Sequence, residues 1–299
     1  MDYRRVEYFL AVVDAGTITA AAEELRIAQP ALSRQMKSLE RDLRMQLFEP
    51  QGNRLALTRA GQKFVGVART LLAETRNAEL TAESLRLGKV ESLVVSATSA
   101  SVHSVIAPFI ATTTEADPVL LTRVTSHYDI YESLTAGSDI AFSPAPVESG
   151  LDYESLGRIP IRAWVGLDHP WADGRGRIHL SDLVGQRLIL PSRGSVSRNF
   201  FDAAISMQDL SIGNLYECDD NPTILSLASA GHGIGVSSDL SKVSAVPLEI
   251  DIAPAGSGQP PELLQLPLYV AWRPGHYASA TIRQLAIRLH QFLDAQLLR

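Results

Sequence analysis

The stretch TITAAAEELRIAQPALSRQMKSLERDL, residues 17 to 43, indicates two helices joined by a short turn. Three successive alanines let the first helix pack closely, and Pro30 favours the start of the second because its ring holds φ near the helical value. Along the second helix an apolar stripe recurs at helical spacing. The stripe consists of Leu32, Met36, Leu39 and Leu43. This pattern predicts a helix-turn-helix whose second helix buries one face.

The opposite face of the second helix is polar and cationic. It carries Gln29, Ser33, Arg34, Lys37 and Arg41, and no acid interrupts it before Glu40. Amide, hydroxyl and guanidinium groups read base edges in a major groove, while Lys and Arg hold phosphates. We therefore predict that this face binds duplex DNA. The alternative is an ordinary amphipathic helix pair with a solvated polar face.

The distribution of charge supports the DNA-binding interpretation. The chain has 299 residues, 45% of them hydrophobic and 20% charged, and a net charge of −6, which is the balance of a globular protein. Residues 1–88 hold 13 Lys and Arg against 11 Asp and Glu, a net +2, whereas the remaining 14 and 22 give −8. Local positive charge on an acidic chain indicates a small DNA-reading module attached to a larger body.

Two further elements flank the helix pair. Apolar residues at helical spacing predict a first helix over Tyr3–Ala15. The turn signal PQGN at residues 50–53 separates two short β-compatible runs and predicts a two-stranded wing. Arg54 in the hairpin and Arg59 beyond it are candidates for contacts to phosphates or to a minor groove. A solvated arginine is the alternative at both positions.

A long helix is predicted over Arg59–Leu87, with Gly88 ending it. Its length is on the order of 43 Å, from roughly 29 residues at about 1.5 Å each. Apolar and small residues form a seam with four-three spacing. The seam consists of Phe64, Ala68, Leu71, Thr75, Ala78, Ala82 and Leu85. So thin a seam needs a partner, and we expect a second copy of the helix, which would present two reading heads to a pseudo-palindromic DNA site.

These segments resemble the LysR-type transcriptional regulators. The likeness is carried by FLAVVDAGTITAAAEEL, AQPALSRQMKSLERDL and LFEPQGNRLALTRAG, and later by GSDIAF, DHPWA and AGHGIGV. The resemblance implies a winged helix-turn-helix DNA-binding domain over residues 1–58, a dimerising linker helix over 59–88 and an effector-binding domain over 89–299. It also implies that Gln29, Pro30, Ser33 and Arg34 lie nearest the bases.

Two positions depart from the family's pattern. Ala28 stands where the family usually has a Ser or Thr helix cap, whose side chain is typically worth about 1 kcal/mol. Pro50 stands where the family tends to have Arg, which removes one expected phosphate contact from the wing.

The rest of the chain alternates strands and helices, which favours a mostly parallel α/β sheet with ligands bound at the carboxyl ends of the strands. The strands are expected at residues 93–96, 119–124 and 139–142, then near 161–167, 187–190, 215–218, 234–237 and 266–272. Helical patterns cover residues 105–110 and 128–136 and the final segment to 298. The resemblance implies two lobes similar to periplasmic binding proteins, lobe I about 89–161 and 267–299 and lobe II about 162–266.

Hydroxyl-rich loops after these strands are the candidate effector site. Backbone N–H groups and hydroxyls at the start of a helix after residue 97 would favour an anion. The candidates are Thr98, Ser99 and Ser101, then Thr125 and Ser126, and, from the loop PSRGS, Arg193 and Ser195. Arg193 would pair with an acidic effector, and an exposed loop arginine is the alternative. Each hydroxyl is alternatively a helix cap, and His103 and His127 near the crevice are alternatively structural.

The resemblance makes a small organic acid the default effector. Relatives that sense acids from aromatic-ring breakdown often place an Arg directly after the strand at residues 139–142. This chain has Ser143 there, so the class of effector stays open.

No run approaches the ~18 apolar residues of a membrane span, and the first residues lack the apolar stretch of a signal peptide, so we expect a cytoplasmic protein. Cys218 is the single cysteine and the seven histidines lack metal-binding spacing, so no disulfide, metal or other cofactor is expected. The expected partners are double-stranded DNA, a small-molecule effector, further copies of the chain in a homodimer and homotetramer, and RNA polymerase.

Effector-controlled, sequence-specific transcriptional regulation is the function that these observations favour. An enzyme acting on the ligand is one alternative, but the chain has no nucleophile elbow, Walker loop, G-x-G-x-x-G after a strand or H-E-x-x-H. An architectural DNA binder without an effector is the other. The acidic, two-lobed remainder argues against it.

Overall fold

The computed structural model describes residues 2–51, 54–240, 243–253 and 260–297. The chain forms two compact units, one holding most of the chain up to Lys89 and the other most of the chain from Val90.

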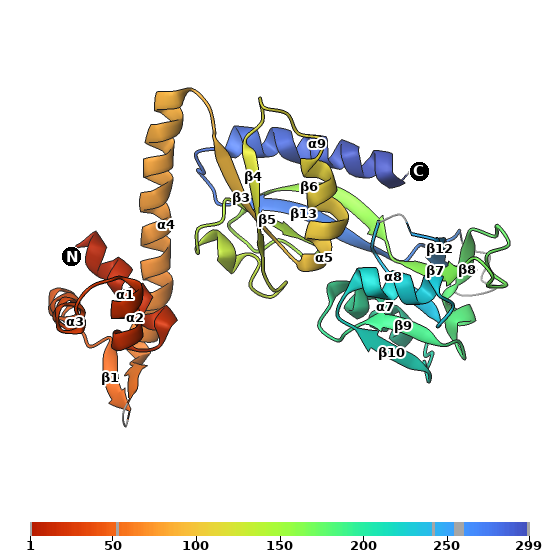
Figure 1. Ribbon diagram of the computed structural model, residues 1–299, viewed down its shortest axis with the longest axis horizontal. Helices are drawn as coiled ribbons and strands as arrows, with labels where there is room; N and C mark the ends of the chain where they lie inside the picture. Colours follow the sequence, from red (N-terminus) through yellow and green to blue (C-terminus); the bar gives the residue numbers. More distant parts are fainter. Residues whose placement is uncertain (1, 52–53, 241–242, 254–259, 298–299) are drawn as a thin grey trace. The chain divides into compact units, whose positions relative to one another are not determined.

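The first unit contains the predicted helices and wing (Figure 1). Its elements are α1 (Tyr3–Ala15), α2 (Ile18–Glu24), α3 (Gln29–Leu43), β1 (Phe48–Gln51), β2 (Arg54–Leu57) and α4 (Arg59–Leu87). β1 and β2 pair antiparallel, and the predicted turn residues 52 and 53 lie outside the described residues. Gly88 ends α4 with φ at 69°, a left-handed conformation that suits glycine.

The core of the first unit explains how α3 is held. Leu32, Met36 and Leu39 are buried against Val6 and Phe9 of α1. The Phe9 ring lies 5.5 Å from that of Phe48 in the wing and 5.3 Å from that of Phe64 in α4. α1, the wing and α4 therefore pack together in one apolar cluster.

Part of the predicted α4 seam belongs to this core. Phe64 and Leu71 pack against the cluster, and Ala68 is fully buried in it. The unit's own helices therefore cover Ala68 fully and Phe64 and Leu71 only in part, so the seam predicted to face a second copy is shared with this core. Thr75 is half-buried, while Ala78 and Ala82 are exposed.

Two contacts hold the wing beside α3, one from the side chain of Glu40 and one at Gly61. Glu40 Oε1 accepts hydrogen bonds from the backbone N–H groups of Leu47 at 2.8 Å and Phe48 at 3.1 Å. Gly61 of α4 packs so closely on the wing that a Cβ there would lie 2.1 Å from the carbonyl oxygen of Leu47. Glu40 thus turns its charge toward the backbone instead of adding an acid to the DNA-binding face.

The second unit consists of two lobes, each built on a mixed sheet. In lobe I the strand order is β4-β3-β5-β13-β6, and in lobe II it is β10-β9-β11-β7-β12-β8. The lobe I strands are β3 (Ser92–Ala97), β4 (Val119–Val124), β5 (Ile140–Ser143), β6 (Asp152–Pro160) and β13 (Gln265–Trp272). The lobe II strands are β7 (Arg162–Gly166), β8 (Arg177–His179), β9 (Leu188–Pro191), β10 (Leu215–Cys218), β11 (Ile234–Ser237) and β12 (Ala245–Asp251).

Helices cover these sheets. Lobe I carries a continuous helical segment made of α5 (Ser99–Ser101), a π-helical turn (Val102–Ile106) and α6 (Ala107–Ile110), together with α9 (Ser279–Leu297). Lobe II carries α7 (Val196–Met207), α8 (Asn221–Ser229) and a 3-10 helix (Leu180–Leu183). No helix among the described residues is both long and apolar enough to cross a membrane.

Two predictions for this unit need correction. The sheets are mixed, because β13 runs antiparallel to β5 and β6, and β7 runs antiparallel to β11 and β12, while the other neighbouring strands are parallel. The helix predicted over residues 128–136 is only a 3-10 helix at Glu132–Leu134. Local hydroxyl bonds favour turns here: Ser126 Oγ accepts from the Tyr128 N–H, and Ser133 Oγ donates to the Ile130 carbonyl.

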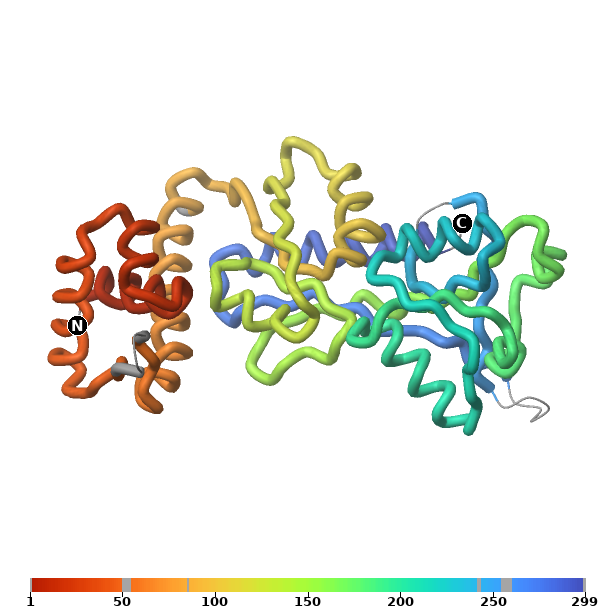
Figure 2. Tube along the Cα trace, turned by 60° about the horizontal axis from the view of Figure 1, so that its bottom comes forward, coloured from red at the N-terminus to blue at the C-terminus, as the bar shows by residue number. Residues whose placement is uncertain are grey.

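The chain passes between the lobes at two adjacent points (Figure 2). β6 leads directly into β7, and β13 returns to lobe I beside it, with Gln265 paired to Pro160. The Ile161 N–H donates to the Leu264 carbonyl at 2.8 Å, which joins the two crossings.

The Glu40 contacts give a direct prediction. Glu40→Ala should speed hydrogen exchange of the Leu47 and Phe48 amides about tenfold, because each loses a charge-assisted acceptor worth on the order of 1.4 kcal/mol. Exchange is measured by NMR on the full chain. Glu40→Gln is the matched control, since its amide oxygen still accepts these bonds. Equal exchange in wild type and Glu40→Ala would contradict the assignment.

Candidate functional site

The polar face of α3 is available to a partner. Gln29, Pro30, Arg34, Lys37 and Arg41 are exposed, and Ser33 is half-buried at the edge of the face. Within the part of the chain that the structure describes, neither the Arg34 guanidinium nor the Lys37 ammonium has an acidic partner. The face therefore presents donors and positive charge without internal compensation.

The start of α3 and the wing complete this surface. Ala28 makes no side-chain cap bond, as its sequence predicts, and Pro30 occupies the first turn. Arg59 is exposed at the start of α4. Arg54 begins β2, and its side chain lies outside the described residues.

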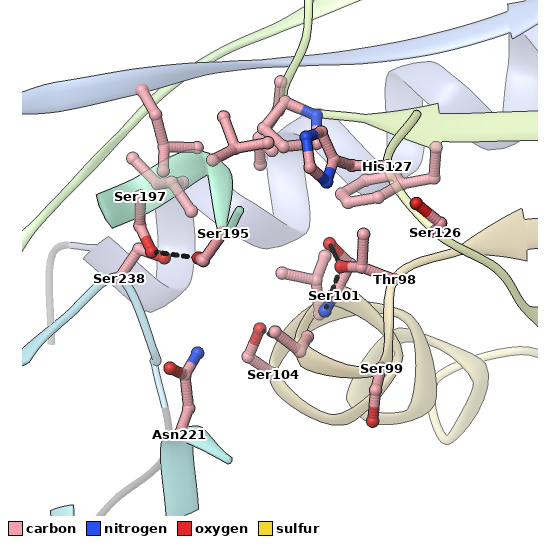
Figure 3. A pocket seen from close by; sticks show the side chains of 18 of the residues that line it. Thr98, Ser99, Ser101, Ser104, Ser126, His127, Ser195, Ser197, Asn221 and Ser238 are labelled. Carbon is pink, nitrogen blue, oxygen red and sulfur yellow. Dashed lines mark hydrogen bonds between the residues drawn. The ribbon is translucent and has the colours of Figure 1, made fainter. Parts of the chain in front are cut away.

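The second candidate site is a cavity of about 250 Å³ between the lobes (Figure 3). Six of the seven predicted effector residues line it. They are Thr98, Ser99, Ser101, Thr125, Ser126 and Ser195. His127 lines it as well, whereas His103 does not. The loops come together because they follow the carboxyl ends of parallel strands β3, β4 and β9.

Several of these hydroxyls already have partners. Thr98 Oγ1 accepts a hydrogen bond from the Ser101 N–H at 3.2 Å and donates to Ser101 Oγ at 3.0 Å, so Thr98 caps the helix (Figure 3). Ser126 Oγ accepts from the Tyr128 N–H at 3.2 Å, and Ser195 Oγ lies 2.9 Å from Ser197 Oγ. A hydroxyl can therefore cap a helix and line the cavity at the same time.

Arg193 is the predicted residue that the structure keeps out of the cavity. Its side chain is 83% exposed, and its Nε lies 3.7 Å from Glu217 Oε1. The arginine that turns inward is Arg198, which is 4% exposed. It donates to Asp202 Oδ1 at 2.8 Å, the Pro191 carbonyl at 3.0 Å and Glu217 Oε1 at 3.1 Å. Arg198 therefore fastens the end of β9 to α7 and β10.

Sequence reasoning missed other lining residues. Lobe II adds Ser197, Asp219, Asn221 and Ser238, and lobe I adds Ser104. The apolar part of the wall includes Val105, Phe142, Ile159, Leu266 and Leu268. Asp219 and Asn221 follow β10, a strand that was predicted, so the rule that ligands lie after strand ends was sufficient to nominate them.

Charge in the cavity is sparse. Asp219 is the one carboxylate in the lining, and no Lys or Arg of the described residues lines it. Burial lowers the pKa of His127 below its ordinary value, more than the nearby Asp129 raises it, so the ring is neutral at pH 7. In the described chain, no group of three or more His, Cys, Asp or Glu is placed to hold a metal ion.

Two family models match the chain. A family model described as "Bacterial regulatory helix-turn-helix protein, lysR family" matches residues 3–62. A second, described as "LysR substrate binding domain", matches residues 88–294.

Individual relatives agree with the family models. The chain is 30% identical over 212 residues to the HTH-type transcriptional regulator TfdT of Cupriavidus pinatubonensis, covering 69% of this chain and 92% of TfdT. It is 31% identical over 247 residues to the regulatory protein NocR of Agrobacterium fabrum, covering 78% of this chain and 79% of NocR. The fold is similar to that of full-length CbnR in complex with its target DNA, with a TM-score of 0.63, 22% identity and coverage of 97% and 100%.

Arg198 of α7 and Arg193 of the loop before it should behave differently. Arg198→Ala should lower the free energy of unfolding of the effector-binding unit by about 1 to 3 kcal/mol, because three buried or partly buried acceptors lose a charged donor. Arg193→Ala, the matched control, should change it by less than about 0.5 kcal/mol, since its ion pair is exposed. Urea unfolding followed by tryptophan fluorescence measures both. Equal losses of unfolding free energy in the two variants would show that Arg198 does not fasten the end of β9.

Proposed function

The chain belongs to the LysR family of bacterial transcriptional regulators, and on that premise we propose how its parts divide the work. It is a DNA-binding transcriptional regulator with an effector-binding domain, and not an enzyme. We assign residues 1–58 to DNA binding, 59–88 to the linker and 89–299 to effector binding. The protein acts in the cytoplasm, where bacterial DNA lies.

α3 inserts into the major groove. Gln29, Pro30, Ser33 and Arg34 in its first turns lie nearest the bases, and Lys37, Arg41, Arg54 and Arg59 hold phosphates. The observation that carries this proposal is that Arg34 and Lys37 are exposed, and have no acidic partner among the described residues, on a helix whose other face is buried. A charged side chain without an internal partner remains free to exchange water for DNA.

A second copy pairs along the part of α4 that the first unit's core leaves open. Thr75, Ala78 and Ala82 continue the seam beyond Leu71, and their small side chains allow two helices to approach closely. Two-fold pairing matches a pseudo-palindromic site whose half-sites lie about one helical turn apart, roughly 34 Å or a multiple of it.

A small-molecule effector occupies the cavity between the lobes and contacts Thr98, Ser99, Ser101, Thr125, Ser126 and Ser195. It regulates only if it binds two lobe arrangements with different affinities. Gly88 joins α4 to the effector-binding domain. A change in the arrangement of the two lobes is therefore passed through α4 to the two DNA-binding domains of the dimer. A DNA-binding protein that is purely architectural needs no effector cavity. The cavity therefore disfavours the alternative that this chain is an architectural DNA binder.

The proposed base contact is tested with Arg34→Ala. Binding to a duplex selected from random sequence should weaken by about 1 to 3 kcal/mol, while binding to scrambled DNA weakens far less, because a base contact contributes only at the right base. Fluorescence anisotropy at fixed salt measures both affinities. Arg175→Ala, the same change in the effector-binding domain, is the control and should alter neither. Equal losses on both duplexes would assign Arg34 to a phosphate instead.

A further inference from the structure

The cavity between the lobes is poorly suited to an anion. Among the described residues that line it, Asp219 carries the one carboxylate, which repels a negative ligand. Arg193 and Arg198 do not compensate, because Arg193 lies outside the cavity and Arg198 is engaged by three acceptors. The Ser101 N–H at the start of the helix is also occupied, since it donates to Thr98 Oγ1.

Asn221 points to a different kind of ligand. It begins α8, is only 9% exposed, and directs its amide into the cavity (Figure 3). Among the described residues its side chain has no hydrogen-bond partner. An amide that faces a cavity offers both a hydrogen-bond donor and an acceptor to a ligand. A ligand with complementary uncharged groups would meet both.

Two hydroxyls extend the same pattern. Thr125 and Ser238 line the cavity from opposite lobes, and neither hydroxyl has a partner among the residues that the structure describes. The neutral ring of His127 adds a further donor and acceptor pair. Phe142, Leu266 and Leu268 form an apolar wall beside these groups. The lining thus offers neutral hydrogen bonds on some sides and apolar contact on another.

We propose that the cavity binds an uncharged polar molecule with an apolar flank, of the amide or polyhydroxy kind, with Asn221 as its main polar contact. This proposal rests on the proposed effector function. The cavity volume of about 250 Å³ suits a small ligand. The proposed ligand differs from the organic acid that the family resemblance makes the default.

The experiment uses matched triplets that differ in charge and little in size. Benzamide, benzoate and benzylamine form one triplet, and glucose, gluconate and glucosamine form another. Thermal shift and calorimetric titration on the full-length protein compare the three members of each triplet. We expect the neutral member of at least one triplet to raise the unfolding temperature, because a ligand of the native state stabilises it, and the charged members to bind more weakly.

Asn221→Leu tests the proposed contact for that neutral member. The substitution keeps a similar volume and removes the amide, so affinity should fall about three- to tenfold. Asn199→Leu makes the same chemical change on the exposed side of α7 and should leave affinity unchanged. Equal affinity of the Asn221→Leu and wild-type proteins for the neutral ligand would overturn the role of Asn221.

Other outcomes overturn the ligand class. Tighter binding of a carboxylate or an amine than of its neutral counterpart would do so, as would the absence of binding by every neutral member. Titration of DNA into the same preparations separates this result from a failure of the regulator function. If DNA binding persists and responds to a charged member, the function stands and only the proposed ligand class falls.

Discussion

The burial of one stripe of α3 is the constraint on which the DNA-binding site depends. Leu32, Met36 and Leu39 are buried against α1, and a helix turns about 100° per residue, so Arg34 and Lys37 must face outward. Glu40 strengthens the arrangement because its carboxylate accepts from two wing N–H groups. The same packing that stabilises the first unit therefore exposes its cationic face.

The effector-binding domain follows a comparable rule. Parallel strands in both lobes end toward the cavity: Thr98 and Thr125 follow β3 and β4, and Ser195 and Ser238 follow β9 and β11. The two chain crossings join the lobes beside this space through the Ile161 and Leu264 backbone. Strand ends set where a ligand binds, whereas the side chains on the loops set which ligand is accepted.

How far the sequence could predict the structure depended on how local the signal was. The bounds of α1, α3 and α4 follow from caps and helical periodicity, and they were predicted closely. β6 was not predicted, because its polar and apolar residues and Gly157 give no clear strand pattern until β13 pairs with it. Neither the inward turn of Arg198 nor the orientation of Asn221 has a local signature, since both depend on elements distant in the chain.

The central claim is that α3 reads DNA through the major groove. Methylation interference on a duplex selected by the full-length protein tests it most directly, because methylation of guanine N7 alters the major groove and methylation of adenine N3 alters the minor groove. The account predicts interference from guanine N7 in two regions separated by about one helical turn or a multiple of it. Interference from adenine N3 alone would contradict it.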